Sequence, residues 1–438
     1  MTPSRFNIVS RLPDSDRWLV ANLLRAEADI LDSSEYDALQ RGDAAAFPEL
    51  AVKGYLTDPD EELRLYRKAY ADFIDGRDRD EVQLFFVPGY ACNFACSYCY
   101  QDAYASGVDA QEPEPIVDAF FRYVDQAFAG RKKYVTVFGG EPLLPTPRAR
   151  RFLELLVEGT SSRGLDLAVV TNGFHVEEYL DLLCRARIRE IQITLDGIGA
   201  VHDQRRHLAG GQPTFERIVA GIDACLARGL AVNLRVVVDR DNLSRLPELA
   251  TFAVERGWTR HPLFKTQLGR NYELHHCQAS PDRLYSRLEL HAELYRLARA
   301  HPQLLQFHKP AFSFAKFLTE RGELPDPLFD SCPGCKTEWA FDASGRIYPC
   351  TATVGKDGEQ VGTFHPEVRL ERASIECWEE RDVTSIAECR ECPQQLACGG
   401  GCASVAKNRT GRLLAPDCRP VGELAGLGVA LYSESEVE

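Results

Sequence analysis

The sequence predicts an α/β protein, a partial (β/α)6 TIM barrel with a small N-terminal α+β domain and a cysteine-rich C-terminal domain. Three observations support this prediction. Apolar runs of strand length alternate with amphipathic helical stretches from Val82 onward, which is the pattern of parallel β/α units. About six such units are present, too few for a closed eight-stranded barrel. Most of the 15 cysteines lie in the last quarter of the chain.

The length of 438 residues predicts several domains, which we expect at 1–80, 81–310 and 325–425. The N-terminal unit has strand-like runs at Phe6–Val9 and Trp18–Val20. Asp32, followed three residues later by Glu35, is expected to cap a helix that runs to Leu39.

The barrel elements follow from the apolar pattern. Strands are expected at Val82–Val87, Tyr134–Phe138, Leu165–Val170, Glu190–Leu195, Ala231–Val238 and Leu263–Gln267. Helices are expected at Pro115–Phe128, Arg148–Glu158, Thr214–Arg228, Leu243–Glu255 and Pro281–Ala300. In such barrels function resides on the loops after the strand C-termini, so motifs at those positions are candidates for the site.

Composition and charge exclude several classes of protein. The longest apolar runs, such as Leu167–Val170, are too short to cross a bilayer, so no membrane partner is expected. The formal charge of -14 repels a phosphate backbone, so no nucleic acid partner is expected either. The start of the chain lacks a basic segment followed by an apolar one, which predicts a cytoplasmic location. In a reducing compartment, closely spaced thiols indicate metal or cluster ligands rather than disulfides.

The first group of thiols follows the first predicted barrel strand. Cys92, Cys96 and Cys99 form a CxxxCxxC loop. Three thiolates can hold three irons of a 4Fe-4S cluster and leave the fourth iron open to a substrate or cofactor. Structural zinc is the alternative, but zinc normally takes four ligands and the loop contains no histidine.

This loop, with the aromatic Tyr98 before its last cysteine, resembles the signature of the radical S-adenosylmethionine (SAM) superfamily. Further motifs follow successive predicted strands, namely Gly139-Gly140-Glu141-Pro142, Thr171-Asn172-Gly173, Thr194-Leu195-Asp196-Gly197 and His202-Asp203-Gln204-Arg205-Arg206. The run Val232–Val236 and the downstream Asn242 also fit. Each motif alone is a common turn, but their order along the strands supports the resemblance.

The resemblance implies roles for these residues. The backbone at Gly139 and Gly140 and the Glu141 carboxylate would meet the amino group of SAM, and Arg206 would bind its carboxylate as a bidentate fork. Tyr98, Thr194 and Asp196 would belong to the same SAM-binding site. One 4Fe-4S cluster on the three thiols would then bind SAM.

The C-terminal cysteines resemble the SPASM extension of radical SAM enzymes, which carries two auxiliary 4Fe-4S clusters. By the family's pairing, one cluster would bind Cys332, Cys335, Cys350 and Cys402, and the other Cys389, Cys392, Cys398 and Cys418. Eight thiolates fill two such clusters completely, so electron transfer is at least as natural a role as substrate binding. Two all-cysteine zinc sites would need the same number of thiolates.

Four cysteines lie outside these sets. Cys184 and Cys225 fall in amphipathic helices and are expected to be small buried hydrophobic residues. Cys377 has no assignment. Cys277, in His275-His276-Cys277, has the composition of a metal site, but no position of the family matches it.

The resemblance implies reductive cleavage of SAM to a 5'-deoxyadenosyl radical that removes hydrogen from an unactivated C–H bond. SPASM enzymes mostly modify peptides or proteins, so the expected activity is oxidative modification or cross-linking of a residue in a ribosomally made precursor peptide or protein. A flavodoxin or ferredoxin would donate the electron. The N-terminal unit resembles the opening segment of peptide maturases, and it would present a strand edge to a leader peptide or only cap the barrel.

Two alternatives stay open. An anaerobic sulfatase maturase, which makes formylglycine, carries an aspartate directly after the auxiliary cysteine of its GxxxxC element, but here Thr351 follows Cys350. The other alternative is a non-catalytic iron-sulfur or zinc scaffold.

Overall fold

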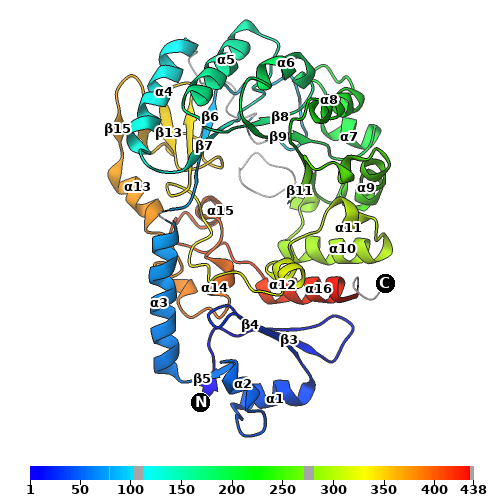
Figure 1. Cartoon of the computed structure of the whole chain (residues 1–438), viewed down its shortest axis with the longest axis vertical. Coiled ribbons are helices and arrows are strands. Elements are labelled where there is room, and N and C mark those ends of the chain that lie inside the picture. The colour runs from blue at the N-terminus through cyan, green and yellow to red at the C-terminus, as the bar shows by residue number, and fades with distance from the viewer. Residues whose placement is uncertain (78, 100, 102–111, 271–280, 435–438) are drawn as a thin grey trace.

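The computed structural model describes residues 1–77, 79–99, 101, 112–270 and 281–434. The barrel lies at one end of the molecule and a small N-terminal sheet at the other, and the long helix α3 (Pro59–Arg77) connects them (Figure 1). Among the helices of these ranges, none is both long enough and apolar enough to cross a bilayer.

Six parallel strands form the barrel, and neighbours in the sheet follow chain order. They are β6 (Val82–Val87), β7 (Lys133–Val137), β8 (Leu167–Thr171), β9 (Ile188–Thr194), β10 (Val232–Val238) and β11 (Phe264–Arg270). The prediction of a partial (β/α)6 barrel is confirmed. The first strand has the predicted bounds, and the others shift by up to three residues.

Helices surround these strands on the outside (Figure 1). They are α4 (Pro113–Ala127), α5 (Pro147–Ser162), α6 (Val176–Leu183), α7 (Ala200–Arg205), α8 (Phe215–Ala227) and α9 (Leu246–Glu255), with 3-10 turns η2 (Leu243–Arg245) and η3 (Trp258–Arg260) around α9. The predicted helix Pro281–Ala300 is divided. A 3-10 turn, η4 (Pro281–Arg283), comes first, and α10 (Arg287–Ala300) begins only after Ser286, whose side chain caps it together with Glu289. Two short helices follow, α11 (Leu304–Phe307) and α12 (Ala315–Arg321).

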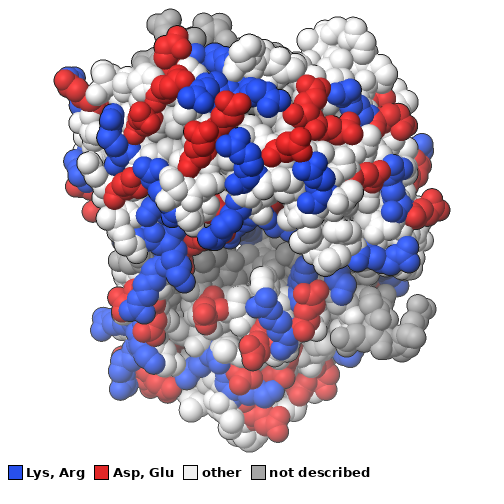
Figure 2. Space-filling model, turned by 45° about the horizontal axis from the view of Figure 1, so that its top comes forward, with Lys and Arg blue, Asp and Glu red and all other residues white. Residues whose placement is uncertain are grey.

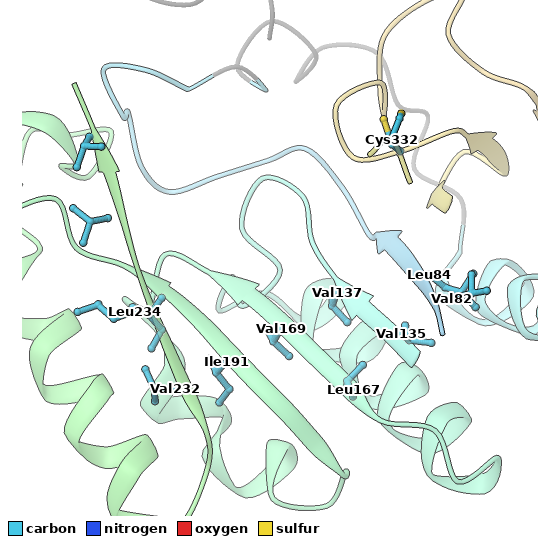
Figure 3. Close-up of a cluster of buried hydrophobic side chains, with 14 of the residues drawn as sticks. Val82, Leu84, Val135, Val137, Leu167, Val169, Ile191, Val232, Leu234 and Cys332 are labelled. Atoms are coloured by element: carbon cyan, nitrogen blue, oxygen red, sulfur yellow. The ribbon is translucent and has the colours of Figure 1, made fainter. Parts of the chain in front are cut away.

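The two faces of the barrel strands differ in chemistry because successive side chains point to opposite sides. The outward residues, such as Val135, Val169 and Leu234, are fully buried among apolar neighbours, and Figure 3 shows them in a row across adjacent strands. Inward positions include Gln192 and Asn233, which line a cavity. The interior of this barrel is therefore a cavity lined by both polar and apolar side chains instead of a packed apolar core.

The N-terminal unit contains an antiparallel sheet of β2 (Ile8–Arg11), β3 (Trp18–Asn22) and β4 (Glu27–Leu31). Helix α1 (Ser33–Arg41) begins at Asp32 with the expected capping box, in which Asp32 accepts from the Glu35 amide and Glu35 reaches back. The remaining elements are α2 (Glu49–Val52) and a two-residue pairing of β1 (Thr2–Pro3) with β5 (Leu56–Thr57).

The C-terminal region contains a strand that the sequence analysis did not predict. β12 (Glu338–Asp342) pairs in parallel with β6 and becomes the seventh parallel strand of the barrel sheet. β13 (Arg346–Tyr348), β14 (Gly362–Thr363) and β15 (Arg369–Leu370) continue the sheet in antiparallel fashion. The helices that follow are α13 (Arg372–Glu379), η5 (Ala387–Cys389), α14 (Gln395–Cys398), α15 (Ala403–Thr410) and α16 (Val421–Glu434).

Helix α3 is held against the C-terminal region by aromatic packing. Phe329 is fully buried and contacts the rings of Tyr66, Tyr70 and Phe73 at centroid distances of 5.1, 5.2 and 5.6 Å. The Tyr70 hydroxyl also donates to Asp382 at 2.8 Å. Helix α3 of the N-terminal region thus packs directly on the C-terminal region. The domain boundaries near residues 80 and 325 stay predictions.

We expect Phe329→Ala to lower the free energy of unfolding by about 3–5 kcal/mol, because it removes a ring that three aromatic side chains surround. Phe317→Ala is the matched control, since Phe317 is 40% exposed, and it should cost less than about 1 kcal/mol. Urea denaturation measures both. Equal losses for the two variants would contradict this account of the interface.

Candidate active site

One cavity of about 710 Å³ lies inside the barrel and extends to the loops after the C-terminal ends of its strands. Eight of the residues that we predicted for the first site line it, namely Cys92, Cys96, Tyr98, Cys99, Gly139, Gly140, Thr194 and Arg206. The other two predicted residues, Glu141 and Asp196, are buried behind the wall of this cavity. The barrel therefore brings together motifs that are more than a hundred residues apart in sequence.

Backbone hydrogen bonds attach the cysteine loop to the segment after α7. The amides of Ala95 and Ser97 donate to the carbonyls of His207 and Arg205, both at 2.9 Å. In return, the Ala209 amide donates to the Asn93 carbonyl at 2.8 Å. The loop that carries the thiols is thereby fixed next to Arg206.

The two glycines of the second motif allow this loop to pack against β7. A Cβ atom on Gly140 would lie 2.3 Å from the carbonyl oxygens of both Tyr90 and Ala91. Gly139 has a φ of 145°, and a Cβ there would lie 2.6 Å from the Gly89 carbonyl oxygen. Only glycine fits at these positions, and the close approach is to the protein's own backbone.

Glu141 is directed into the protein. Its carboxylate accepts hydrogen bonds from the amides of Leu143 and Asn172, at 2.8 and 2.6 Å, and from the Thr171 hydroxyl at 2.7 Å. Burial raises the pKa of Glu141, and the hydrogen bonds from Asn172 and Thr171 oppose this rise. The carboxylate holds the Thr171-Asn172-Gly173 turn in place, and its expected contact with the amino group of SAM stays a prediction.

Arg206, which the sequence analysis predicts to bind a carboxylate, lies in the wall of the cavity. Its Nη1 donates to the Tyr98 hydroxyl at 2.8 Å, and Tyr98 donates to Asp196 at 2.6 Å. Asp196 also accepts from the Val237 amide at 2.9 Å, which fixes the end of β10. The Nε of Arg206 is buried without a partner among the described residues. A buried donor of this kind needs an acceptor, which a bound carboxylate would supply.

The three thiols of the loop share one electrostatic environment. Burial raises the pKa of Cys96, with Arg206 opposing and the Cys99 thiol adding to the rise. The Cys96 and Cys99 thiols also raise the pKa of Cys92, after the larger effect of local burial. The three thiols therefore interact electrostatically, and their role as ligands of one cluster stays a prediction.

The C-terminal thiols fall into two such sets. Burial raises the pKa of Cys350, and the Cys332 and Cys402 thiols add to this effect; Cys332 likewise acts on Cys335. In the second set, burial raises the pKa of Cys389 to about 12, with further contributions from Cys398, Cys392 and Cys418. These electrostatic interactions link the same thiols as the two groups of four inferred from the family resemblance, and the role of these thiols as cluster ligands stays a prediction.

A buried network of charges lies between the two sets. Arg381 is completely buried, and its guanidinium donates to the carbonyls of Gly400, Gly401, Leu413 and Ala415 at 2.8–3.1 Å. Lys336 and Asp330 form a buried ion pair at 2.7 Å, and Asp330 also accepts from the Cys332 amide at 2.9 Å. The network joins the loops of both thiol sets.

Within the described part of the chain, no three His, Cys, Asp or Glu side chains are arranged to hold a metal ion. A tetrahedral zinc ion requires its sulfurs about 2.3 Å from one atom, which draws the thiols tightly together. A four-iron cluster binds each thiolate through a different iron and spreads them more widely. The choice between clusters and zinc at these thiols stays a prediction.

Comparison with known proteins agrees with this geometry. Residues 86–253 match the model of the Radical SAM superfamily. The chain contains a radical SAM domain. It is 31% identical over 169 residues to the pre-heme d1 synthase of Dinoroseobacter shibae, covering 38% of this chain and 39% of that one. It is 32% identical over 154 residues to the GTP 3',8-cyclase of Klebsiella pneumoniae, covering 34% and 44%. The chain thus spans less than half the length of these two relatives.

Solved structures share the fold beyond the radical SAM domain. Native anSMEcpe with bound AdoMet superposes with a TM-score of 0.60 at 16% identity, covering 81% of this chain and 97% of that one. Streptococcus suis SuiB bound to precursor peptide SuiA gives a TM-score of 0.54 at 15% identity, covering 96% and 99%. At such identities the likeness shows the fold.

Cys184, Cys225 and Cys377 do not line this cavity. Cys225 is fully buried as expected, but the prediction for Cys184 is wrong, because this residue is exposed at the C-terminal cap of α6. Cys377 is exposed on α13. Cys277 lies outside the described residues.

Sequence reasoning missed the residues that line the part of this cavity farther from the cysteine loop. They include Gln83, Tyr134, Glu190, Gln192, Asn233, Arg235, Lys265 and Gln267. A signal was present, since polar residues alternate with apolar ones along Val232–Val236. In an ordinary parallel barrel both strand faces are apolar, so such an alternation indicates a polar lumen.

We expect Gly140→Ala to destabilise the radical SAM domain by about 1–3 kcal/mol, because its Cβ collides with two carbonyl oxygens of the chain that leads into the cysteine loop. Gly89→Ala is the control, since a Cβ there has no neighbour within 4 Å. Thermal unfolding measures the stability, and labelling of the thiols reports whether the loop has moved. A Gly140→Ala protein with unchanged stability and thiol reactivity would contradict the packing argument.

Proposed function

We propose that this radical SAM enzyme carries a C-terminal SPASM domain and oxidatively modifies or cross-links a residue in a peptide or protein substrate. The observation that carries the proposal is one cavity whose wall contains three thiols and an arginine with a buried donor that has no described partner. Such a cavity has room for a nucleotide cofactor and part of a substrate side by side.

The residues fit the cofactors that a radical SAM domain implies. Cys92, Cys96 and Cys99 would hold one 4Fe-4S cluster and leave its fourth iron open. The Arg206 guanidinium would bind the SAM carboxylate, with Tyr98 and Asp196 holding the arginine in position. Thr194 and the backbone of Gly139 and Gly140 would form the adjacent wall.

When bound, the cluster supplies the electron that splits SAM into methionine and a 5'-deoxyadenosyl radical, which removes hydrogen from the substrate. The protein supplies position and exclusion of water. The backbone bonds of the cysteine loop keep the thiols at the barrel mouth, and the cavity encloses the reacting groups. A radical survives only in such a sheltered site, because it would otherwise react with other groups.

The C-terminal thiols would hold two auxiliary clusters, which makes three in the enzyme. Cys332, Cys335, Cys350 and Cys402 would bind the first, and Cys389, Cys392, Cys398 and Cys418 the second. Thr351 and Ala352 follow Cys350 and line the cavity, so the first auxiliary cluster would lie beside the substrate. It could then accept the second electron of a two-electron oxidation.

A peptide substrate is supported by the similarity in fold to SuiB bound to precursor peptide SuiA and to anSMEcpe bound to AdoMet and Cp18Cys peptide. The N-terminal unit offers a place for a leader peptide, since no described strand pairs with the outer edge of β4. Pairing with this edge would be recognition by β-augmentation. We also propose a cytoplasmic location and a flavodoxin or ferredoxin as electron donor.

Sulfatase maturation remains the second candidate because of one contact. Thr351 replaces the aspartate expected in that family, but its amide and hydroxyl donate to the Glu338 carboxylate at 2.7 and 2.9 Å. A carboxylate is therefore present at this element, supplied by another strand. Production of formylglycine in a sulfatase-derived peptide would identify this activity, and cross-linking or another modification would exclude it.

Replacement of any cysteine of the first loop by alanine should abolish SAM cleavage, because the cluster that delivers the electron loses a ligand. Most of the auxiliary iron should remain. Cys225→Ala is the control, since this thiol lies in the core away from the cavity and should leave cleavage intact. Chromatography of 5'-deoxyadenosine after reduction with dithionite measures the activity. Cleavage by Cys92→Ala, Cys96→Ala and Cys99→Ala at the normal rate would refute the assignment, and the absence of cleavage in the wild type would support the scaffold alternative.

The anaerobically reconstituted protein should contain about twelve irons per chain, which corresponds to three four-iron clusters. Iron and sulfide analysis tests this number, and the same analysis detects zinc. A plateau near four irons would count against the two auxiliary clusters.

A further inference from the structure

The cavity has the opposite charge balance to the protein as a whole. The chain carries a formal charge of -14, and on the face shown in Figure 2 acidic and basic side chains are interspersed. Among the described residues that line the cavity, four are arginine or lysine (Arg206, Arg235, Lys265 and Arg270), and one, Glu190, is acidic. The cavity therefore attracts anionic groups, an effect strengthened by its low-dielectric walls.

Three of the four cations already have partners. Arg206 donates to Tyr98, Lys265 forms an ion pair with Glu190, and Arg270 donates to the Tyr285 carbonyl at 2.6 Å. Arg235 is different, because its guanidinium has no hydrogen-bond or ion-pair partner among the described residues. A half-buried guanidinium with five donors and no described partner favours an anion from outside the protein.

Strands β9, β10 and β11 position the Arg235 side chain. Arg235 lies on β10 in register with Thr194 on β9 and with Gln267 on β11, and both of these residues line the cavity. Its guanidinium lies against Gly269, where a Cβ would come within 3.0 Å of Nη2 and 3.2 Å of Nε. Glycine at this point of β11 leaves the space that the guanidinium occupies.

A neutral polar group lies on the same strand. Asn233 is 6% exposed, lines the cavity, and has an Oδ1 atom with no partner among the described residues. An unpaired buried acceptor beside an unpaired cation suits a ligand that offers both a donor and an anion. An acidic amino acid residue within a peptide has this combination, since its backbone N–H donates and its side chain is a carboxylate.

We propose that Arg235 binds a carboxylate of the substrate, so that the enzyme acts on a peptide with an aspartate or glutamate at or next to the modified position. This inference rests on the proposed function, which makes a peptide the substrate. The planar guanidinium matches a carboxylate in bidentate fashion. Arg206 remains the residue that would bind the carboxylate of SAM. Arg235 would bind the carboxylate of the substrate in the same cavity.

The test compares two probes that differ only in charge, N-acetylglutamate amide and N-acetylglutamine amide. Each is titrated by ligand-observed NMR into the reconstituted enzyme in the presence of SAM. Wild type should bind the glutamate probe about tenfold more tightly, the effect of one charge-assisted contact. Arg235→Gln should reduce this preference to less than about twofold, and Arg235→Lys should retain part of it.

Two further variants separate the carboxylate site from general damage. Gly269→Ala keeps the charge but crowds the guanidinium, so it should weaken the preference for the glutamate probe. Arg228→Gln, on the outer surface next to Asp181, should leave the preference unchanged. Iron content and thermal unfolding establish that each variant is folded.

Equal binding of the two probes by wild type, or a preserved preference in Arg235→Gln, would overturn the proposal. An Arg235→Gln variant that no longer binds SAM but still prefers the glutamate probe would also overturn the proposal, because Arg235 would then serve the cofactor. The proposed function is judged separately, by SAM cleavage in wild type. A protein that prefers the glutamate probe but cleaves no SAM would keep the carboxylate site and lose the radical mechanism.

Discussion

The parallel pairing of β12 with β6 determines how the two halves of the site meet. This pairing places Asp342, the last residue of β12, beside Val87 at the entry to the cysteine loop. Asp342 accepts hydrogen bonds from the hydroxyls of Tyr90 and Tyr348, both at 3.1 Å, and so joins that loop to β13. The chain then turns at Cys350 toward the cavity. Without this strand the C-terminal thiols would belong to a separate module.

Buried polar side chains then determine the conformation of the loops around the site. Arg381 satisfies four carbonyls in loops that carry both thiol sets, and Glu141 satisfies three donors around one turn. Burying a charge costs free energy that hydrogen bonds offset, so each of these side chains specifies the backbone around it. Loops rich in glycine and cysteine have little apolar surface, and such networks replace the core that they lack.

The sequence revealed the parts of the structure that depend on local patterns. The six parallel strands, the capping box at Asp32 and the order of the motifs follow from periodicity and short-range chemistry. β12 was missed because its five residues offer too short an apolar run, and its place is set by a partner about 250 residues away. The exposure of Cys184 and the inward direction of Glu141 depend on where a helix ends and on which donors surround a turn. Neither is encoded in spacing. The residues of the part of the cavity farther from the cysteine loop were visible only as an alternation within strands that otherwise looked wholly buried.

The alternation of apolar and polar residues along the barrel strands assigns the stability of the fold and the specificity of the cavity to different side chains. The outward face of each barrel strand is buried against helices and carries the apolar packing, while the inward face carries Gln192, Asn233 and Gln267, which contribute little hydrophobic burial. Exchanges among inward residues therefore leave the folding free energy almost unchanged and alter only the shape and polarity offered to a guest molecule. A barrel built in this way can diverge in the compounds it accepts over evolutionary time without passing through unfolded intermediates.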